Sequence, residues 1–334
     1  MRPTQRYRAG PALAPAAILA TALALSILPA PAAAQAFPTM PVRIVVPFPP
    51  GGGTDILARL IAARMTESFG QPVLVDNRGG ANGTIGAALV ARATPDGHTL
   101  LVVPSGFAAN PALYPALPYS NDRDFAPVSQ LAASPLVLVV HPSLPARSVK
   151  ELVALAQKQP GRLDYATAGS GSPPHLATEY FKLLAKVQIV HIPYKGAGPA
   201  GADVLAGQVP IYFMNLLQAM PLIRSNRLRA LGVTTPKRFG ALPDVPTIAE
   251  GGIDGYQFTN WYGALAPAGV PRDVLARLQG EIARILNTQE VRTRLASEGA
   301  EVVASTPEQF SAFLKAETAK FERIIREARI RATD

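Results

Sequence analysis

Short aliphatic runs alternate with longer, helix-spaced stretches over most of the chain. Residues 42–46 are aliphatic apart from Arg43, which is typical of a strand covered on both faces. Residues 56–69 then carry apolar side chains at helical spacing, and Gly70 and Pro72 end that pattern. Strand, loop and helix recur in this order along the chain. We therefore predict βαβ units on mostly parallel sheets.

The same two periodicities predict the other elements. Thr84, Ser148 and Ser172 are expected to cap helices, Ser148 as part of a capping box with Glu151. Further strands are predicted over residues 73–75, 99–103, 136–140, 163–166, 189–192, 211–213, 229–234 and 256–266. Further helices are predicted over residues 85–92, 148–159, 173–185, 198–207, 272–286, 290–298 and 307–330, with shorter ones after 106 and 215.

The loop between the first strand and the first helix is a candidate anion site. Three prolines within residues 47–50 end the strand, and the glycines at 51–53 can leave backbone N–H groups open to a ligand. Thr54 or Asp55 is expected to cap the helix that begins at Ile56. A glycine loop at a helix N-terminus favours an anion. No Gly-Lys-Ser/Thr follows, so a nucleotide-hydrolase phosphate loop is excluded.

Two α/β lobes with a hinge are expected. Glycine- and serine-rich loops at 167–175 and 193–198 repeat the strand–loop–helix arrangement in the second half. We predict that residues 37–138 and 261–334 form one lobe and 139–260 the other, with hinge strands near 134–140 and 256–266. Ligands of open α/β sheets bind beyond the carboxyl ends of the strands, so the cleft between the lobes should hold the site.

Residues 1–36 have the features of a secretory signal peptide. An arginine-containing start is followed by an apolar run over 12–28, and Ala34-Gln35-Ala36 offers a cleavage site near Ala36. Without the leader, 298 residues with a formal charge of +6 remain, and no cysteine is available for a disulfide. The basic residues are scattered among acidic ones, so nucleic acid is not an expected partner, whereas a small anionic solute is compatible with the charge.

Catalytic and cofactor interpretations have weaker support in the sequence. The glycines of 196–201 match GxGxxG, but Asn215 follows the next strand where a dinucleotide site needs an acid. Ser170 lacks the GxSxG context of a hydrolase, because Ala168 occupies the first glycine position. The four histidines are too far apart in the sequence to predict a metal site. We therefore expect no enzyme activity, cofactor or metal, and keep an exported serine hydrolase as an alternative.

Several motifs together resemble the tripartite tricarboxylate transporter substrate-binding proteins, often called the Bug family. They are the segments at 42–55, 76–86, 95–100, 193–196 and 261–263, which follow the family's order over nearly the whole mature chain. The resemblance implies a type II-like, two-lobed periplasmic binding protein of the Venus flytrap kind. It also implies a small carboxylate ligand, docking to a tripartite-type membrane permease, and a monomer in the periplasm. A ligand-sensing role in a signalling system is a second alternative.

The resemblance also implies which residues contact the ligand. The first lobe would supply residues of the motif at 42–55. The second lobe would supply hydroxyl and backbone groups from its glycine- and serine-rich loops. The implied residues are Phe48, Gly53, Thr54, Asp55, Ser105, Thr167, Ala168, Ser170, Ser172, His175, Tyr194, Lys195 and Asn215. Of Trp261 and Tyr262, one is expected in the core and the other on a cleft wall.

One departure from the family pattern suggests a ligand preference. Family members commonly carry Phe-Asp-Asn where this chain has Phe213-Met214-Asn215. The loss of an acid would disfavour amino-acid ligands if that acid met an amino group. The resulting hypothesis is that the ligand is a carboxylate with an apolar or aromatic body. The protein should then bind aspartate and glutamate less tightly than dicarboxylates without an amino group.

Overall fold

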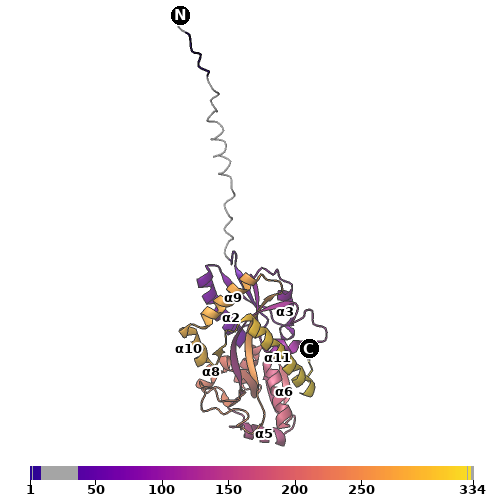
Figure 1. Ribbon diagram of the computed structural model, residues 1–334. Coiled ribbons are helices and arrows are strands. Elements are labelled where there is room, and N and C mark those ends of the chain that lie inside the picture. The colour runs from indigo at the N-terminus through magenta and orange to yellow at the C-terminus, as the bar shows by residue number, and fades with distance from the viewer. Residues whose placement is uncertain (2, 9–36, 329, 332–334) are drawn as a thin grey trace. The chain divides into compact units, whose positions relative to one another are not determined.

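The computed structural model describes residues 1, 3–8, 37–328 and 330–331 (Figure 1). The chain divides into two compact units, Met1–Phe37 and Pro38–Asp334, and all the elements below belong to the second. Most of the signal peptide predicted over 1–36, including its cleavage site near Ala36, lies outside the described residues. Within the described residues, no helix combines the length and apolar character needed to cross a membrane.

A first group of strands contains the strand that precedes the candidate anion loop. Strand β1 (Val42–Val46) lies between β2 (Val73–Asn77) and β3 (Thr99–Pro104) and is parallel to both. Strand β9 (Thr259–Pro267) pairs antiparallel with β3 on one side and with β4 (Phe125–Val140) on the other. The short β10 (Glu301–Val302) also pairs with β4. The loops after β1, β2 and β3 therefore leave from the same edge.

A second group of strands shares β4 with the first. From Leu136 onward, β4 pairs antiparallel with β7 (Ile211–Asn215) and from Val137 with β8 (Arg229–Val233). Strand β5 (Asp164–Thr167) is parallel to β7 and to β6 (Val190–Pro193). The carboxyl ends of β5, β6 and β7 thus also meet at one edge. The expected α/β organisation with parallel βαβ units is present in both groups.

Strand β4 is much longer than the predicted 136–140 strand. It begins at Phe125 and pairs with β9 as far as Pro135 before it changes partners. Two prolines and several small or polar residues hide this strand from pattern analysis, because proline cannot donate to a ladder. The pairing with β9 tolerates them through register shifts between Pro127 and Ser129 and between Gln130 and Ala132.

Helices cover the strands and bring the two groups together (Figure 1). The C-terminal α11 packs against α4, β4 and α6, so it joins parts of both groups. The helices are α2 (Gly53–Phe69), α3 (Thr84–Ala91), α4 (Gly106–Leu113), α5 (Val149–Lys158), α6 (Pro173–Ala185), α7 (Ala197–Leu205), α8 (Leu216–Arg224), α9 (Arg272–Leu286), α10 (Gln289–Glu298) and α11 (Pro307–Ala328), with the 3-10 turn η2 (Ala81–Gly83).

The helix caps agree only in part with the prediction. Ser148 accepts a hydrogen bond from the Glu151 amide at 3.1 Å, which confirms that cap. Helix α2 begins earlier than expected, so Thr54 and Asp55 lie inside it and Gly52 is the N-cap without a side-chain bond. Thr84 is likewise the first residue of α3 rather than its cap. The N-cap of both helices is glycine, so no capping side chain covers the first backbone amides of the helix.

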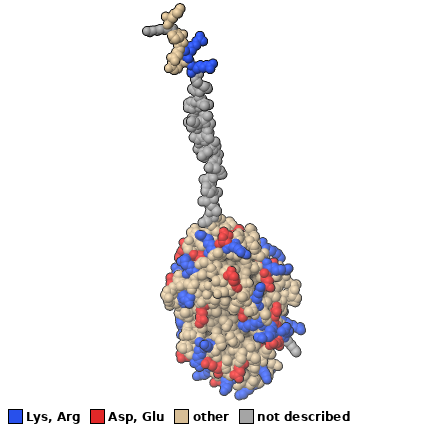
Figure 2. Space-filling model, viewed as in Figure 1, with Lys and Arg blue, Asp and Glu red and all other residues tan. Residues whose placement is uncertain are grey.

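The surface of the folded unit carries mixed charge. Figure 2 shows acidic and basic side chains interspersed over the face in view. Within the core, Trp261 stacks edge-on against Phe310 and Phe313, and its indole N–H donates to Glu317 at 2.9 Å. Trp261 is therefore the core residue of the Trp261–Tyr262 pair, as predicted for one of the two.

Candidate functional site

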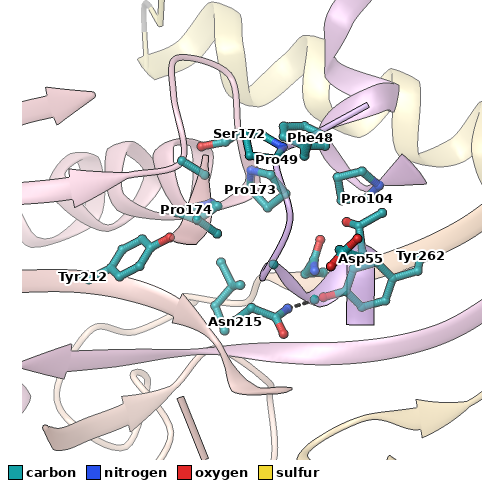
Figure 3. A pocket seen from close by; sticks show the side chains of 17 residues that line it. Phe48, Pro49, Asp55, Pro104, Ser172, Pro173, Pro174, Tyr212, Asn215 and Tyr262 are labelled. Atoms are coloured by element: carbon teal, nitrogen blue, oxygen red, sulfur yellow. Dashed lines mark hydrogen bonds between the residues drawn. The ribbon is translucent and has the colours of Figure 1, made fainter. Parts of the chain in front are cut away.

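A small cleft of about 50 Å³ lies where the loops at the carboxyl ends of the parallel strands meet (Figure 3). We call it the inner cleft. Segments from both strand groups line it: Phe48, Pro49, Gly52, Gly53, Thr54, Asp55, Pro104, Leu136, Ala168, Ser172, Pro173, Pro174, Ala197, Tyr212, Asn215, Asn260 and Tyr262.

The start of α2 supplies polar groups to one side of the inner cleft. The first helical bond runs from the Ile56 amide to the Gly52 carbonyl at 3.0 Å, so the amides of residues 53–55 lie ahead of the helical ladder. The Thr54 side chain joins them in lining the cleft. These amides and the helix dipole favour a negatively charged group at this position.

Asp55 stabilises the loop from which those amides project. One carboxylate oxygen accepts from the Gly51 amide at 3.1 Å and Arg59 Nε at 3.0 Å, and the other accepts from Asn77 Nδ2 at 3.0 Å. Burial works to raise the pKa of Asp55, but the hydrogen bonds from Arg59, Asn77 and Gly51 outweigh it and lower that pKa. Asp55 is therefore an ionised carboxylate whose two oxygens are already engaged by the protein, although it also borders the cleft.

The start of α6 forms a very different wall. Ser172 is its N-cap and Pro173 its first residue, as predicted, but Pro173 and Pro174 have no N–H to offer. The Ser172 hydroxyl donates to the Gly169 carbonyl at 2.6 Å. The first two residues of α6 therefore provide no amide donors of the kind found at the start of α2. With Ala168 beside the two prolines, this wall is largely apolar.

Asn215 and Tyr262 meet beside the first residue of α2. Asn215 Oδ1 accepts from the Leu217 amide at 3.0 Å, so its Nδ2 faces and donates to the Tyr262 hydroxyl (Figure 3). Burial raises the pKa of Tyr262, and the phenol stays protonated. Its oxygen accepts from Asn215, the Asn260 side chain is a second hydrogen-bond partner of the hydroxyl, and Tyr262 lines the cleft. Tyr262 is thus the predicted cleft-wall aromatic residue.

Gly53 fits this corner because it has no side chain. A Cβ at this position would overlap both the Tyr262 hydroxyl and the Asn215 amide. The absence of that atom lets the first amides of α2 approach the two polar side chains. Asn260 completes the corner, and its Oδ1 accepts from the Ser105 hydroxyl at 2.7 Å.

A wider outer chamber of about 860 Å³ shares Phe48, Pro49 and Ala168 with the inner cleft. Its other lining residues include loops from both strand groups. Among the sequence-predicted site residues, the structure places Phe48, Gly53, Thr54, Asp55, Ala168, Ser172 and Asn215 on the inner cleft. It places Ser170, Tyr194 and Lys195 on the outer chamber.

The remaining three predicted residues lie behind the lining. Ser105 is fully buried and holds Asn260, as described above. Thr167 accepts from the Gly169 amide at 3.2 Å and shares a 2.6 Å hydrogen bond with His191. His175 Nδ1 accepts from the Gly171 amide at 3.0 Å. The contacts of Thr167 and His175 support the loop from 167 to 172. None of the three residues lines the inner cleft or the outer chamber.

The two imidazoles under that loop are neutral. Their rings stack with centroids 4.2 Å apart. Burial is the largest cause that lowers the pKa of each, from 6.5 to about 4. A neutral His175 can accept the Gly171 amide, which a doubly protonated ring could not do.

Sequence reasoning missed several lining residues, above all Tyr212 and Asn260. Tyr212 is the only aromatic residue with a polar tip in β7, and it stands three positions before Asn215 at the edge where parallel strands end. That position is a usable signal. Met214, in contrast, is buried in a core cluster beside Gly201 and lines neither hollow. The hypothesis about amino-acid ligands therefore has no direct contact to support it.

Comparison with known proteins places this geometry in a family. The sequence pattern described as "Tripartite tricarboxylate transporter family receptor" matches residues 57–330. BugT of Bordetella pertussis is 37% identical over 313 residues, which cover 93% of this chain and 96% of BugT.

Solved structures agree closely with this fold. Rpa4515 of R. palustris with adipate has a TM-score of 0.86 and 38% identity, covering 88% of this chain and 99% of that one. The periplasmic binding protein BugD has a TM-score of 0.85 and 34% identity, covering 88% and 99%. MatC from Rhodopseudomonas palustris with bound malate has a TM-score of 0.83 and 36% identity, covering 86% and 100%.

These neighbours are two-lobed periplasmic binding proteins, which confirms the predicted fold class. The motif resemblance is confirmed as well. The chain belongs to the tripartite tricarboxylate transporter receptor family, which includes the Bug proteins.

Proposed function

We propose that this protein captures a small organic carboxylate in the inner cleft and delivers it to a membrane permease of the tripartite tricarboxylate type. The observation that carries the proposal is the corner built by the amides of 53–55, Thr54 and the Tyr262 hydroxyl. These groups are hydrogen-bond donors at a helix N-terminus, and together they suit an anion. The adipate and malate held by two structural neighbours support the same class of ligand.

The electrostatics of the inner cleft explain why a carboxylate can be bound without a cationic partner. Asp55 is the only charged side chain among the described lining residues, and its charge is balanced by Arg59 and hydrogen bonds. Burying a lysine or arginine there would cost solvation free energy that fixed amide and hydroxyl donors avoid. The carboxylate would lie at the start of α2, with its hydrocarbon body against Phe48, Pro173 and Pro174.

The outer chamber would serve the approach of the ligand. Lys195 and Tyr194 line it beside Ser170, and the amine of Lys195 gives the mouth a positive charge. Ser105, Thr167 and His175 would act by positioning the lining loops. The structure of the loop gives the serine-hydrolase alternative little support, because Ser172 donates to a carbonyl oxygen rather than to a histidine.

The direct test is thermal unfolding of the purified mature chain with mono-, di-, tri- and aromatic carboxylates. A true ligand at about 100 times its Kd stabilises the native state by about 2.7 kcal/mol. We expect at least one carboxylate to raise the Tm, with binding confirmed by calorimetry. A panel that produces no shift at millimolar concentration would overturn the proposal, and ester turnover lost on either Ser170→Ala or Ser172→Ala would favour the hydrolase.

The transport part of the proposal requires an exported chain. The mature protein would act in the periplasm after removal of residues 1–36, and would dock on the permease as a monomer. Deleting the gene should abolish uptake of the radiolabelled ligand identified above, and expression of the full chain should restore it. Unchanged uptake together with a lost transcriptional response would favour the sensing alternative.

A further inference from the structure

The Tyr212 hydroxyl is an exception among the buried tyrosines. It is fully buried and lines the inner cleft, yet it has no hydrogen-bond partner within the part of the chain that the structure describes. The other buried tyrosines all have partners: Tyr119 with Asn110, Tyr165 with Glu179, Tyr256 with the Ala177 carbonyl and Tyr262 with Asn215. An unpaired buried hydroxyl destabilises a folded chain, so its presence at a binding cleft needs an explanation.

Its surroundings leave that hydroxyl directed at the cleft. Figure 3 shows the Tyr212 ring on one side of the inner cleft with its oxygen turned inward, near Pro174. Tyr262 and Asp55 lie on the other side. The neighbouring lining residues Leu136, Ala168 and Pro174 have no polar side-chain atom. Phenylalanine would fill nearly the same volume without leaving an unpaired O–H group.

The chemistry of the group makes it a donor. Burial raises the pKa of Tyr212 well above its ordinary value, so the phenol carries its hydrogen at any physiological pH. A protonated phenol donates one hydrogen bond and most readily satisfies an oxygen acceptor. Because Pro173 and Pro174 offer no amide hydrogen, Tyr212 is well placed to be the specific polar contact on this wall.

We propose that Tyr212 determines specificity by donating a hydrogen bond to an oxygen at the end of the ligand opposite its carboxylate. The site then prefers acids with a second oxygen at the far end to hydrocarbon acids of the same length. This inference rests on the proposed function, since the first carboxylate must occupy the start of α2. A neutral hydroxyl or carbonyl and a second carboxylate share the required acceptor chemistry.

The test compares three series of linear acids with four to eight carbons: ω-hydroxy acids, dicarboxylic acids and unsubstituted acids with a methyl group in place of the terminal oxygen. Calorimetry of the wild-type protein should show roughly tenfold tighter binding of an oxygen-ended acid than of its methyl-ended match. In Tyr212→Phe that preference should disappear through weaker binding of the oxygen-ended acid alone. The hydroxy and dicarboxylic series show which form of acceptor is preferred.

Two readouts separate this role from a structural one. Tyr212→Phe loses no internal hydrogen bond, so the Tm of the ligand-free protein should stay the same or rise. The control Tyr256→Phe loses the bond to the Ala177 carbonyl, so its Tm should fall while its ligand preference stays wild-type. An unchanged preference in Tyr212→Phe, with carboxylates still bound, would overturn this inference alone. Failure of every acid to bind wild-type protein would overturn the proposed function with it.

Discussion

Thr54 combines a hydroxyl with the backbone amide of the second residue of α2, so it can contact a carboxylate twice. Thr54→Val keeps the shape of the side chain and the amide but removes the hydroxyl. One lost hydrogen bond to a ligand is worth about 0.5–1.5 kcal/mol, so the Kd should rise about three- to tenfold. Calorimetry with the carboxylate found in the panel measures this change.

A matched control exists on α11. The Thr318 hydroxyl donates to the Leu314 carbonyl at 2.9 Å and lines neither hollow. Thr318→Val should therefore bind the ligand with wild-type affinity. Equal affinity of Thr54→Val and wild type would show that the hydroxyl does not contact the carboxylate.

Gly53 offers a steric test of the same corner. In Gly53→Ala the new methyl group would meet the Tyr262 hydroxyl and the Asn215 amide, so one of them must move. We expect ligand binding to weaken more than tenfold and the unfolding free energy to fall. Gly280→Ala is the control, because a Cβ there meets open space in the middle of α9. It should raise the unfolding free energy by up to about 1 kcal/mol and leave binding unchanged.

At this scale the sequence predicted which loops build the site better than it predicted which way their side chains point. Proline fixes φ and glycine permits backbone conformations that other residues avoid, so the composition of the loop after β1 predicts where the strand ends and the anion site begins. Thr167 and His175 belong to the correct loop but turn away from the cleft, because packing against His191 decides their orientation. Tyr212 was missed for the same reason, since a tyrosine in an aliphatic strand is usually a core residue.

At the scale of the elements, the stability of the loop between β5 and α6 depends on the ionisation state of two histidines. The neutral rings of His175 and His191 hold it through Gly171 and Thr167. Between pH 6.5 and about 4 the unfolded chain binds protons that the folded chain does not, so stability is present above pH 6.5 and falls as the pH is lowered. A shift of this size corresponds to a loss on the order of 3 kcal/mol for each imidazole that becomes protonated.

Urea unfolding at pH 7.5, 5.5 and 4.5 measures that slope. Two further charged groups act on the pair: Glu179 raises the pKa of His191 and Lys182 lowers it. His175→Asn combined with His191→Gln keeps polar atoms near the loop but cannot titrate, so stability should become nearly flat between pH 6.5 and 4.5. A double variant with the wild-type slope would assign the acid sensitivity to other groups.

Strand β4 shows where element prediction reached its limit. Its second half is aliphatic and was predicted, whereas its first half depends on pairing with β9, a segment more than a hundred residues later. Such non-local pairing leaves no periodic signal when prolines and small residues interrupt the strand. The exchange of partners at Pro135–Leu136 falls inside the hinge segment predicted at 134–140.

For the whole molecule, β4 and β9 are the segments expected to bend when the lobes open. The domain bounds of 37–138 with 261–334 and 139–260 stay a prediction. The described state has the two lobes in contact across the cleft mouth: a Cβ placed on Gly196 would lie 2.9 Å from the Pro49 ring, and one on Gly198 would lie 3.2 Å from the Pro50 carbonyl oxygen. The loop after β1 therefore closes directly onto the start of α7.

Gly198 permits a test of this closure without touching the ligand site. It lines neither hollow, and its φ is not in the left-handed region, so a larger residue disturbs the contact with Pro50 and not the local backbone. In Gly198→Val the branched side chain cannot turn both methyl groups away from that carbonyl. The closed state should lose stability relative to the open state. Because only the closed state binds the ligand tightly, the ligand affinity should fall about tenfold. Small-angle scattering at a ligand concentration below saturation should show a larger radius of gyration for the variant than for wild type, and excess ligand should remove the difference. Gly240→Val, where a Cβ meets open space, should behave as wild type in both measurements. Wild-type affinity in Gly198→Val would mean that the ligand is held without this contact between the lobes.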